Sequence, residues 1–71
     1  MSGSIIMAGY TRQVKKILSE NGCYFLRYGK GDHEIWFNPA LNRPFTVDGN
    51  ITKRTSAVKT LKSAGINARL S

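Results

Sequence analysis

Cysteine and histidine each occur only once in this chain, as Cys23 and His33. A single cysteine cannot form a disulfide bond within the chain, so we expect Cys23 to be a small, buried apolar residue in a reduced compartment. One cysteine, one histidine and four acidic residues also offer no cluster of the kind that binds a metal ion. The sequence therefore predicts a protein with no metal site.

Long apolar segments are absent as well, and the chain is short. A domain of 71 residues buries only about 60% of the surface that its unfolded chain exposes, which leaves a thin core and no room for a deep pocket. We therefore expect no small-molecule cofactor. No apolar run approaches the roughly 20 residues of a membrane-spanning helix, and no signal peptide is evident. We expect a cytoplasmic protein with no membrane partner.

Negative charge is scarce relative to positive charge. Eleven Lys and Arg residues stand against four Asp and Glu, which gives a formal net charge of +7. Such a balance favours a polyanionic partner. A membrane surface or an acidic protein would be attracted by the same charge, but nucleic acid is the interpretation that we favour, and an acidic protein partner need not exclude it.

Two segments of the chain have the apolar spacing of amphipathic helices. Val14, Ile17 and Leu18 predict a helix over residues 11–21, and a second helix is expected over residues 55–65. The apolar face of the second helix would consist of Ala57, Val58, Leu61 and Ala64. We expect Thr11 to cap the first helix and Thr55 or Ser56 the second, with the glycines at 22 and 65 ending them.

Three short segments between these helices are typical of β-strands. They cover residues 23–29, 33–38 and 43–47, and short stretches rich in Gly, Pro and Asn separate them. Pro44, at the start of the third segment, favours an edge strand. Trp36 and Phe37 lie on opposite faces of the second strand, and the sequence leaves open which ring packs in the core and which stays free to stack on a base.

The order of these elements predicts an α+β fold, α-β-β-β-α, in which both helices cover one face of an antiparallel sheet. This two-layer sandwich is the architecture of double-stranded-RNA-binding domains. We expect one domain over residues 11–67 and a tail over residues 68–71. Residues 1–10 are interpreted as a disordered leader or a remnant of expression cloning.

Four local features make residues 11–67 resemble the HicA family of toxin–antitoxin ribonucleases. They are a helix that ends in Asn-Gly directly before a strand, Arg27 near the end of that strand, a Gly-x-His motif followed by an aromatic residue, and the final "LKSAGI". In this chain the motif consists of Gly31, His33 and Trp36. The family most often has Ser before the histidine, where this chain has Asp32, and often has a second histidine after the third strand, where this chain reads "VDGN".

The resemblance implies a toxin that cleaves mRNA without a metal ion, with His33 as the catalytic residue, and a HicB-type antitoxin as its partner. RNA can be cleaved in this way because its own 2′-OH is the nucleophile, and an imidazole, which titrates near neutral pH, can transfer the required protons. Asp32 and Glu34 flank His33, and either carboxylate could favour its charged form. The alternatives are a solvated turn histidine and, above all for Glu34, solvated carboxylates at a strand end.

Basic residues near the strand ends and at the start of the second helix are candidates for binding RNA phosphates. They are Arg27, Lys30, Arg43, Lys53, Arg54 and Lys59. The alternative for each is an ordinary solvated basic surface. Two other functions stay open: a non-catalytic RNA-binding module of the same fold, and a family member that has lost activity and only binds the antitoxin.

Overall fold

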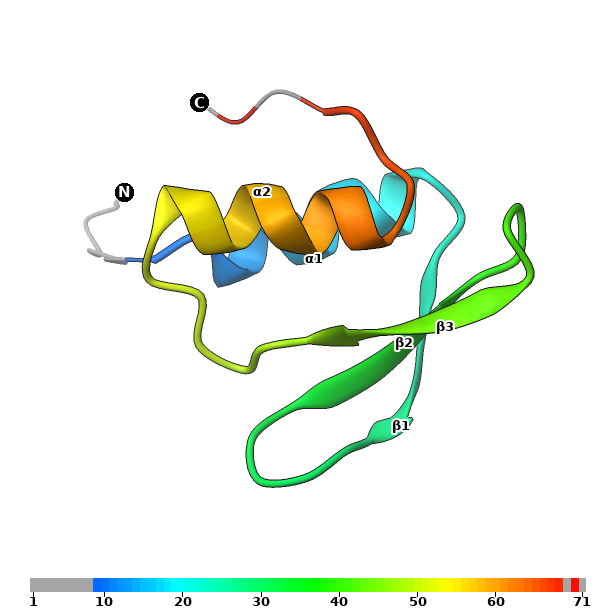
Figure 1. Ribbon diagram of the computed structural model, residues 1–71, viewed down its shortest axis with the longest axis horizontal. Helices are drawn as coiled ribbons and strands as arrows, with labels where there is room; N and C mark the ends of the chain where they lie inside the picture. The colour runs from blue at the N-terminus through cyan, green and yellow to red at the C-terminus, as the bar shows by residue number, and fades with distance from the viewer. Residues whose placement is uncertain (1–8, 69, 71) are drawn as a thin grey trace, which may run out of the picture.

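Two helices and three strands follow one another in the expected order. The structure, a computed structural model, describes residues 9–68 and 70. Its elements are α1 (Thr11–Glu20), β1 (Tyr24–Tyr28), β2 (Glu34–Asn38), β3 (Arg43–Val47) and α2 (Arg54–Ser63). The strands form one antiparallel sheet in the order β1-β2-β3, and the helices lie side by side on one side of it (Figure 1). The prediction of an α+β fold of order α-β-β-β-α is confirmed.

Both helices end at the glycines that the sequence indicated. Gly22 and Gly65 have φ angles of 84° and 75°, a left-handed conformation that costs glycine little. After each of them the chain folds back onto its helix, because the amide of Cys23 donates to Leu18 and the amide of Ile66 donates to Leu61. These bonds satisfy carbonyl groups that a helix end otherwise leaves without partners.

The predicted helix caps are wrong. The N-cap positions belong to Tyr10 and Lys53, and neither side chain makes a capping hydrogen bond. The hydroxyl of Thr11 instead accepts a hydrogen bond of 2.8 Å from the amide of Ile51, a long-range contact that holds the starts of both helices together. The amide of Tyr10 donates to the carbonyl of the same Ile51, at 2.6 Å. The hydroxyl of Thr11 is therefore engaged in a tertiary hydrogen bond and does not cap its own helix.

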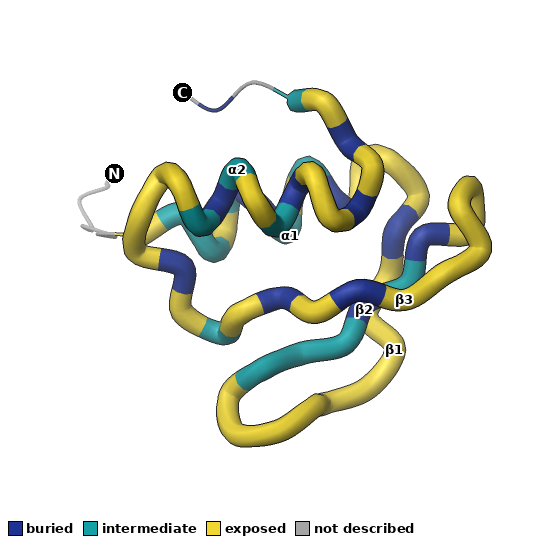
Figure 2. Tube along the Cα trace, in the orientation of Figure 1, coloured by how far each residue is buried: buried dark blue, intermediate teal, exposed yellow. Residues whose placement is uncertain are grey.

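The core lies between the helix pair and one face of β2 and β3 (Figure 2). Alternate residues of these strands point toward the helices, so that Trp36 is buried while Phe37 lies half-buried on the opposite face. The core is completed by residues from both helices and from the segments beside them. Its members are Val14, Leu18, Cys23, Trp36, Phe45, Val47, Ile51, Ala57, Leu61, Ala64, Ile66 and Leu70.

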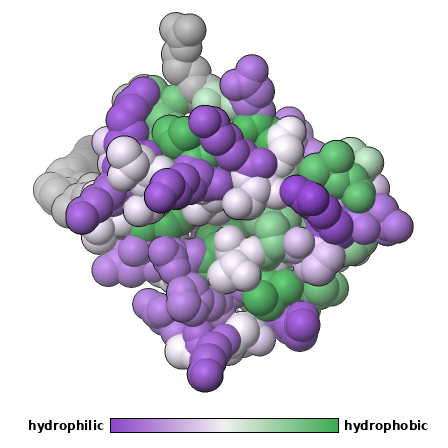
Figure 3. Space-filling view, in the orientation of Figure 1, coloured by the Kyte–Doolittle hydropathy of each residue, from purple (hydrophilic) through white to green (hydrophobic). Residues whose placement is uncertain are grey.

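Strand β1 stays outside this core. All five of its residues are exposed, and Tyr28 retains 74% of its accessible surface. The reason is visible in Figure 1, where the helices lie over β3 and β1 is on the far side of β2. A break in register between Phe25 and Arg27 further separates β1 from a regular ladder. Figure 3 shows apolar surface (green) exposed among hydrophilic side chains, including over the sheet.

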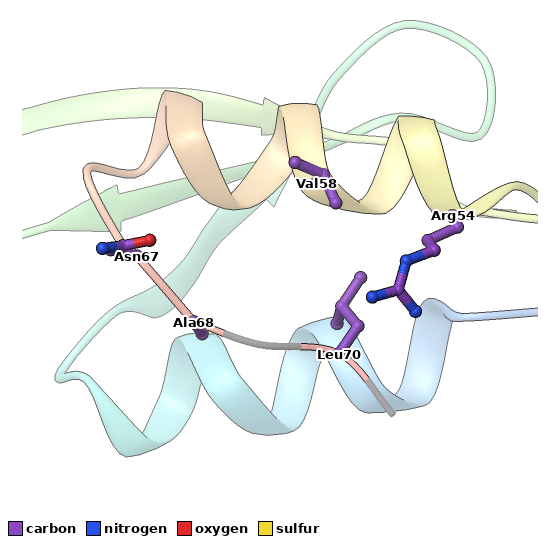
Figure 4. Close-up of a pocket in the computed structure, with 5 residues that line it drawn as sticks. All are labelled: Arg54, Val58, Asn67, Ala68 and Leu70. Atoms are coloured by element: carbon purple, nitrogen blue, oxygen red, sulfur yellow. The ribbon is translucent and has the colours of Figure 1, made fainter.

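The C-terminal segment packs back over the helices. Leu70, which the sequence placed in the tail, is 4% exposed and belongs to the core. Together with Arg54, Val58 and neighbouring residues it surrounds a shallow hollow of about 330 Å³ (Figure 4). Residues 1–8 of the expected leader, and residues 69 and 71 of the expected tail, lie outside the described residues. Within the described part of the chain, α1 and α2 lack the length and apolar character needed to cross a membrane.

Because the core is thin, we expect substitutions at two neighbouring residues of α2 to differ strongly in their effect on stability. Leu61 is 1% exposed, whereas Lys62 lies on the solvent side of the helix. Leu61→Ala should lower the free energy of unfolding by about 2–5 kcal/mol, and Lys62→Ala should change it by no more than about 0.5 kcal/mol. Chemical denaturation followed by circular dichroism measures both values. Equal stabilities would mean that the core face of α2 is wrongly assigned.

Candidate functional site

His33 lies at the end of the turn that joins β1 to β2. The amide of Gly29 donates to the carbonyl of His33 at 2.9 Å, and the amide of His33 donates to the carbonyl of Lys30 at 3.1 Å. These two bonds close a tight turn and fix the backbone of the histidine. The sequence predicts this turn through its glycines, and the structure places the only imidazole of the chain at its edge.

Both nitrogens of the His33 ring face an oxygen atom. Nε2 lies 2.8 Å from Oδ1 of Asp48, and Nδ1 lies 3.0 Å from the carbonyl oxygen of Lys30. Only the protonated ring carries a hydrogen on both nitrogens, so only the imidazolium can donate to both oxygens. The side chains of His33 and Asp48 keep 45% and 49% of their accessible surface. The ring is thus held through both nitrogens and can still be reached by a ligand.

The pairing of β2 with β3 brings Asp48 to this position. Glu34 is opposite Val47 in the ladder, so the next pair outward is His33 and Asp48, on the same face of the sheet. Gly49 follows, and a side chain there would collide with the backbone carbonyl of Asp32. A glycine is therefore required for the two segments to approach so closely.

The sequence offers Asp32 and Glu34 as the carboxylates that could act on His33, but the structure pairs the ring with Asp48. The side-chain partner of the imidazole is Asp48, not Asp32. Glu34 points to the helix side of the sheet, because strand residues alternate in direction. Its carboxylate accepts hydrogen bonds from Lys15 Nζ at 2.9 Å and from Trp36 Nε1 at 2.8 Å. Glu34 thus ties β2 to α1 and takes no part in the histidine site.

The environment of Glu34 has opposing effects on its charge. Burial alone would raise the pKa of Glu34, but the hydrogen bonds from Trp36 and Lys15 and the positive charge of Lys15 outweigh burial and lower that pKa below its ordinary value. Cys23 shows the effect of burial without such partners, because burial raises the pKa of its thiol. A buried thiol of this kind stays protonated and is a poor nucleophile.

The six basic candidates lie in three regions. Arg27 is paired with Ile35 on the same face of the sheet as His33, and Lys30 belongs to the turn that holds the ring. Arg43, the first residue of β3, is paired with Asn38 at the far end of the ladder from His33, and it donates to the carbonyl of Ser63 at 3.2 Å. The remaining three, Lys53, Arg54 and Lys59, belong to the start and middle of α2. The strand register and the turn therefore place Arg27 and Lys30 next to His33.

Two residues of this region escaped the sequence analysis. Asp48 lies just beyond the third strand predicted over residues 43–47, yet counting back from a four-residue turn at 39–42 pairs residue 38 with 43 and hence 33 with 48. Tyr24 was read only as a strand residue. Its ring lies 5.7 Å from that of Phe37, on the face of the sheet that carries His33. Counting residue pairs back from the 39–42 turn predicts the position of Asp48. The register shift between Phe25 and Arg27 changes the partner of Tyr24 from residue 38 to Phe37, so such counting does not find Tyr24.

Comparison with protein-family models, curated proteins and solved structures finds no match for the chain. Among residues 9–68 and 70, no three His, Cys, Asp or Glu side chains gather as metal ligands. The chemistry of the site is therefore inferred from His33, Asp48, Arg27 and Lys30 themselves.

The contacts of Glu34 predict how stability depends on pH. A carboxylate whose pKa is lowered by folding stabilises the protein above its ordinary pKa of 4.5, and this contribution is lost as the pH falls toward the folded-state value. Glu34→Gln should therefore cost about 1–3 kcal/mol near pH 7, the range for a charge-assisted hydrogen bond. The difference from the wild type should shrink in acid.

Glu20→Gln is the matched control for this measurement. It makes the same change of charge at an exposed residue at the end of α1. Urea denaturation at several pH values compares the three proteins. If Glu20→Gln destabilises as much as Glu34→Gln, the effect comes from net charge and the role assigned to the Glu34 contacts is wrong.

Proposed function

We propose that the protein is an endoribonuclease that cleaves mRNA without a metal ion, with His33 as its proton-transfer residue. The observation that carries this proposal is the imidazole ring, half exposed and held through both nitrogens by two oxygen atoms. A solvated turn histidine would need neither contact. The cations closest along the chain and across the sheet, Lys30 and Arg27, would face the phosphate of a bound strand.

The proposed reaction begins with attack of the RNA 2′-OH on the adjacent phosphorus. A bond forms between the 2′-oxygen and phosphorus while the proton of the 2′-OH passes to solvent water. The bond from phosphorus to the 5′-oxygen breaks, and the departing oxygen takes a proton. The imidazolium of His33 is suited to donate that proton. Lys30 and Arg27 would stabilise charge on the phosphoryl oxygens. The products are a 2′,3′-cyclic phosphate and a 5′-hydroxyl end.

Asp48 is a positioning residue in this proposal. Its carboxylate contacts Nε2 of His33 at 2.8 Å and so orients the ring. The incoming phosphate is itself an anion and can take over the Nε2 contact when RNA binds, because both carboxylate and phosphate oxygens accept charge-assisted hydrogen bonds. Asp48 then leaves the nitrogen free to act on the substrate.

The wider assignment is to a toxin of the HicA type with a fold like that of double-stranded-RNA-binding domains. Its support is the α-β-β-β-α order and the glycine turn that presents His33. The partner would be a HicB-type antitoxin that covers the basic surface and the histidine. The exposed aromatic rings of β1 favour the second candidate, a non-catalytic RNA-binding module, because such rings can bind RNA without any chemistry. An inactive relative that only binds the antitoxin is the third.

His33→Ala should abolish cleavage and leave the fold and RNA binding nearly intact. General acid–base catalysis accounts for about 10²–10⁴-fold in rate, and the chain has no second histidine to replace the first. The wild type should cleave a mixed RNA in EDTA and produce cyclic phosphate ends, which end-group analysis detects. Expression of the wild type, but not of the variant, should inhibit growth. Cleavage by His33→Ala at the wild-type rate would leave the RNA-binding module as the better candidate.

Asp48→Asn should slow cleavage about ten- to a hundred-fold, because a positioning residue supports only part of the contribution of His33. The loss should appear in kcat and not in KM, since removing a negative charge cannot weaken the binding of a polyanion. Asp32→Asn is the control, because it makes the same charge change without a contact to the ring. Equal rates for the two variants in single-turnover assays would contradict the role of Asp48.

A further inference from the structure

The face of the sheet that points away from the helices is unusually apolar. In an antiparallel sheet with one covered face, the other face is ordinarily polar. Here strand alternation and register bring together six side chains, which we call the outer face. They are Tyr24, Arg27, Ile35, Phe37, Pro44 and Thr46. Among the described residues no helix covers them, because both helices lie on the opposite side (Figure 1).

Two aromatic rings form the centre of this outer face. Tyr24 and Phe37 are direct cross-strand partners, with ring centroids 5.7 Å apart and planes inclined by 43°. Tyr24 keeps 48% of its accessible surface, so its ring is available to a ligand. Leaving such a ring half in water forgoes part of the free energy that burial of a large apolar side chain contributes. A partner that covers the ring would recover that energy.

The charge of the outer face restricts what this partner can be. Its one charged member is Arg27, and it contains no carboxylate. The whole chain carries a net charge of +7. A second copy of the protein would bring the same positive charge and an opposing Arg27. A ligand that combines negative charge with flat aromatic groups matches both features, and a nucleic acid strand with exposed bases is such a ligand.

The outer face leads directly to the proposed catalytic residue. His33, Ile35 and Phe37 alternate along β2, so His33 continues the same row of side chains. At about 3.3 Å per residue, the ring of Phe37 lies roughly 13 Å along the strand from His33. Arg27 is opposite Ile35, between the two. A bound strand that stacks a base on Tyr24 and Phe37 would therefore carry its backbone past Arg27 toward His33.

We propose that the outer face binds unpaired RNA, with Tyr24 and Phe37 stacking bases of the substrate next to the phosphate that His33 acts on. The inference rests on the proposed ribonuclease activity and deepens it. Bases within a duplex are stacked on one another and are not available to the rings. The substrate class is accordingly single-stranded RNA, although the order of the elements resembles that of domains that bind the double strand.

The test compares two tyrosines of the same strand. Tyr24 belongs to the outer face, whereas Tyr28 is paired with Glu34 on the helix side and is more exposed. Each is replaced by leucine in the His33→Ala protein, which does not consume its ligand. Fluorescence anisotropy then measures the binding of a 12-nucleotide oligouridylate and of a 12-base-pair RNA duplex. Size-exclusion chromatography with light scattering reports the oligomeric state of each protein.

Tyr24→Leu should weaken binding of the oligouridylate about five- to a hundred-fold, the range that corresponds to loss of one base–aromatic stack. Tyr28→Leu should bind like the parent, and neither change should affect the duplex. Tyr24→Phe keeps the ring and should restore affinity. Should Tyr24→Leu fail to fold, Arg27→Gln tests the same face, and it should weaken binding and make the slope of log K against log salt shallower by about 0.7.

Several results would overturn the proposal. One is equal affinity of the Tyr24→Leu and Tyr28→Leu proteins for oligouridylate. Another is a dimer that Tyr24→Leu dissociates without changing RNA affinity, which would make the outer face a contact between copies of the chain. If the wild type does not cleave RNA but Tyr24→Leu still weakens binding of oligouridylate and not of the duplex, the proposed ribonuclease activity is refuted. The outer face then remains an RNA-binding surface. If the wild type cleaves oligouridylate and the Tyr24→Leu change, made in the active protein, leaves the rate unchanged, the role of the outer face is refuted and the ribonuclease activity stands.

Discussion

The pairing register of β2 with β3 is the constraint on which the rest of the molecule depends. Side chains alternate along a strand, so a slip by one residue would move every one of them to the opposite face. In the observed register Trp36 and Phe45 meet on the core side, and His33 and Asp48 meet on the other. The same alignment thus builds the core and the candidate site.

A buried polar residue secures this register. Asn38, at the end of β2, is 4% exposed, donates to the carbonyl of Ala64 at 2.6 Å and accepts from the amide of Ala40 at 2.9 Å. One of these bonds shapes the turn to β3, and the other attaches the end of α2 to the sheet. Removing a partner from a buried polar group costs more than such a bond contributes on balance, so a shifted register would be penalised at this residue first.

Much of the fold could be predicted from local patterns, whereas contacts between distant residues could not. The apolar spacing of α2 and the glycines at 22 and 65 determine the helices through interactions within a few residues. The hydroxyl of Thr11, by contrast, bonds to Ile51, forty positions away, and nothing in the local sequence reveals that competition. The position of Asp48 opposite His33 is an intermediate case, because counting residue pairs back from the turn predicts it once the length of the turn is known. The exposure of β1 depends on where the helices come to lie, which strand propensity does not encode.

The distribution of basic residues between the helix layer and the sheet explains why an aromatic surface would matter to a protein this basic. Lys53, Arg54 and Lys59 belong to α2, in the helix layer of a molecule whose extents are 38 × 27 × 22 Å. In the proposed function these cations would attract RNA during its approach, an effect that salt screens beyond about 8 Å at physiological ionic strength. Beside the ring along the chain and across the sheet, the two cations Arg27 and Lys30 stand against the two carboxylates Asp32 and Asp48, so these charges nearly cancel. With so little net charge beside the histidine, electrostatic attraction alone cannot hold a strand in register there. Stacking on Tyr24 and Phe37, which salt does not screen, is the interaction on this face that can.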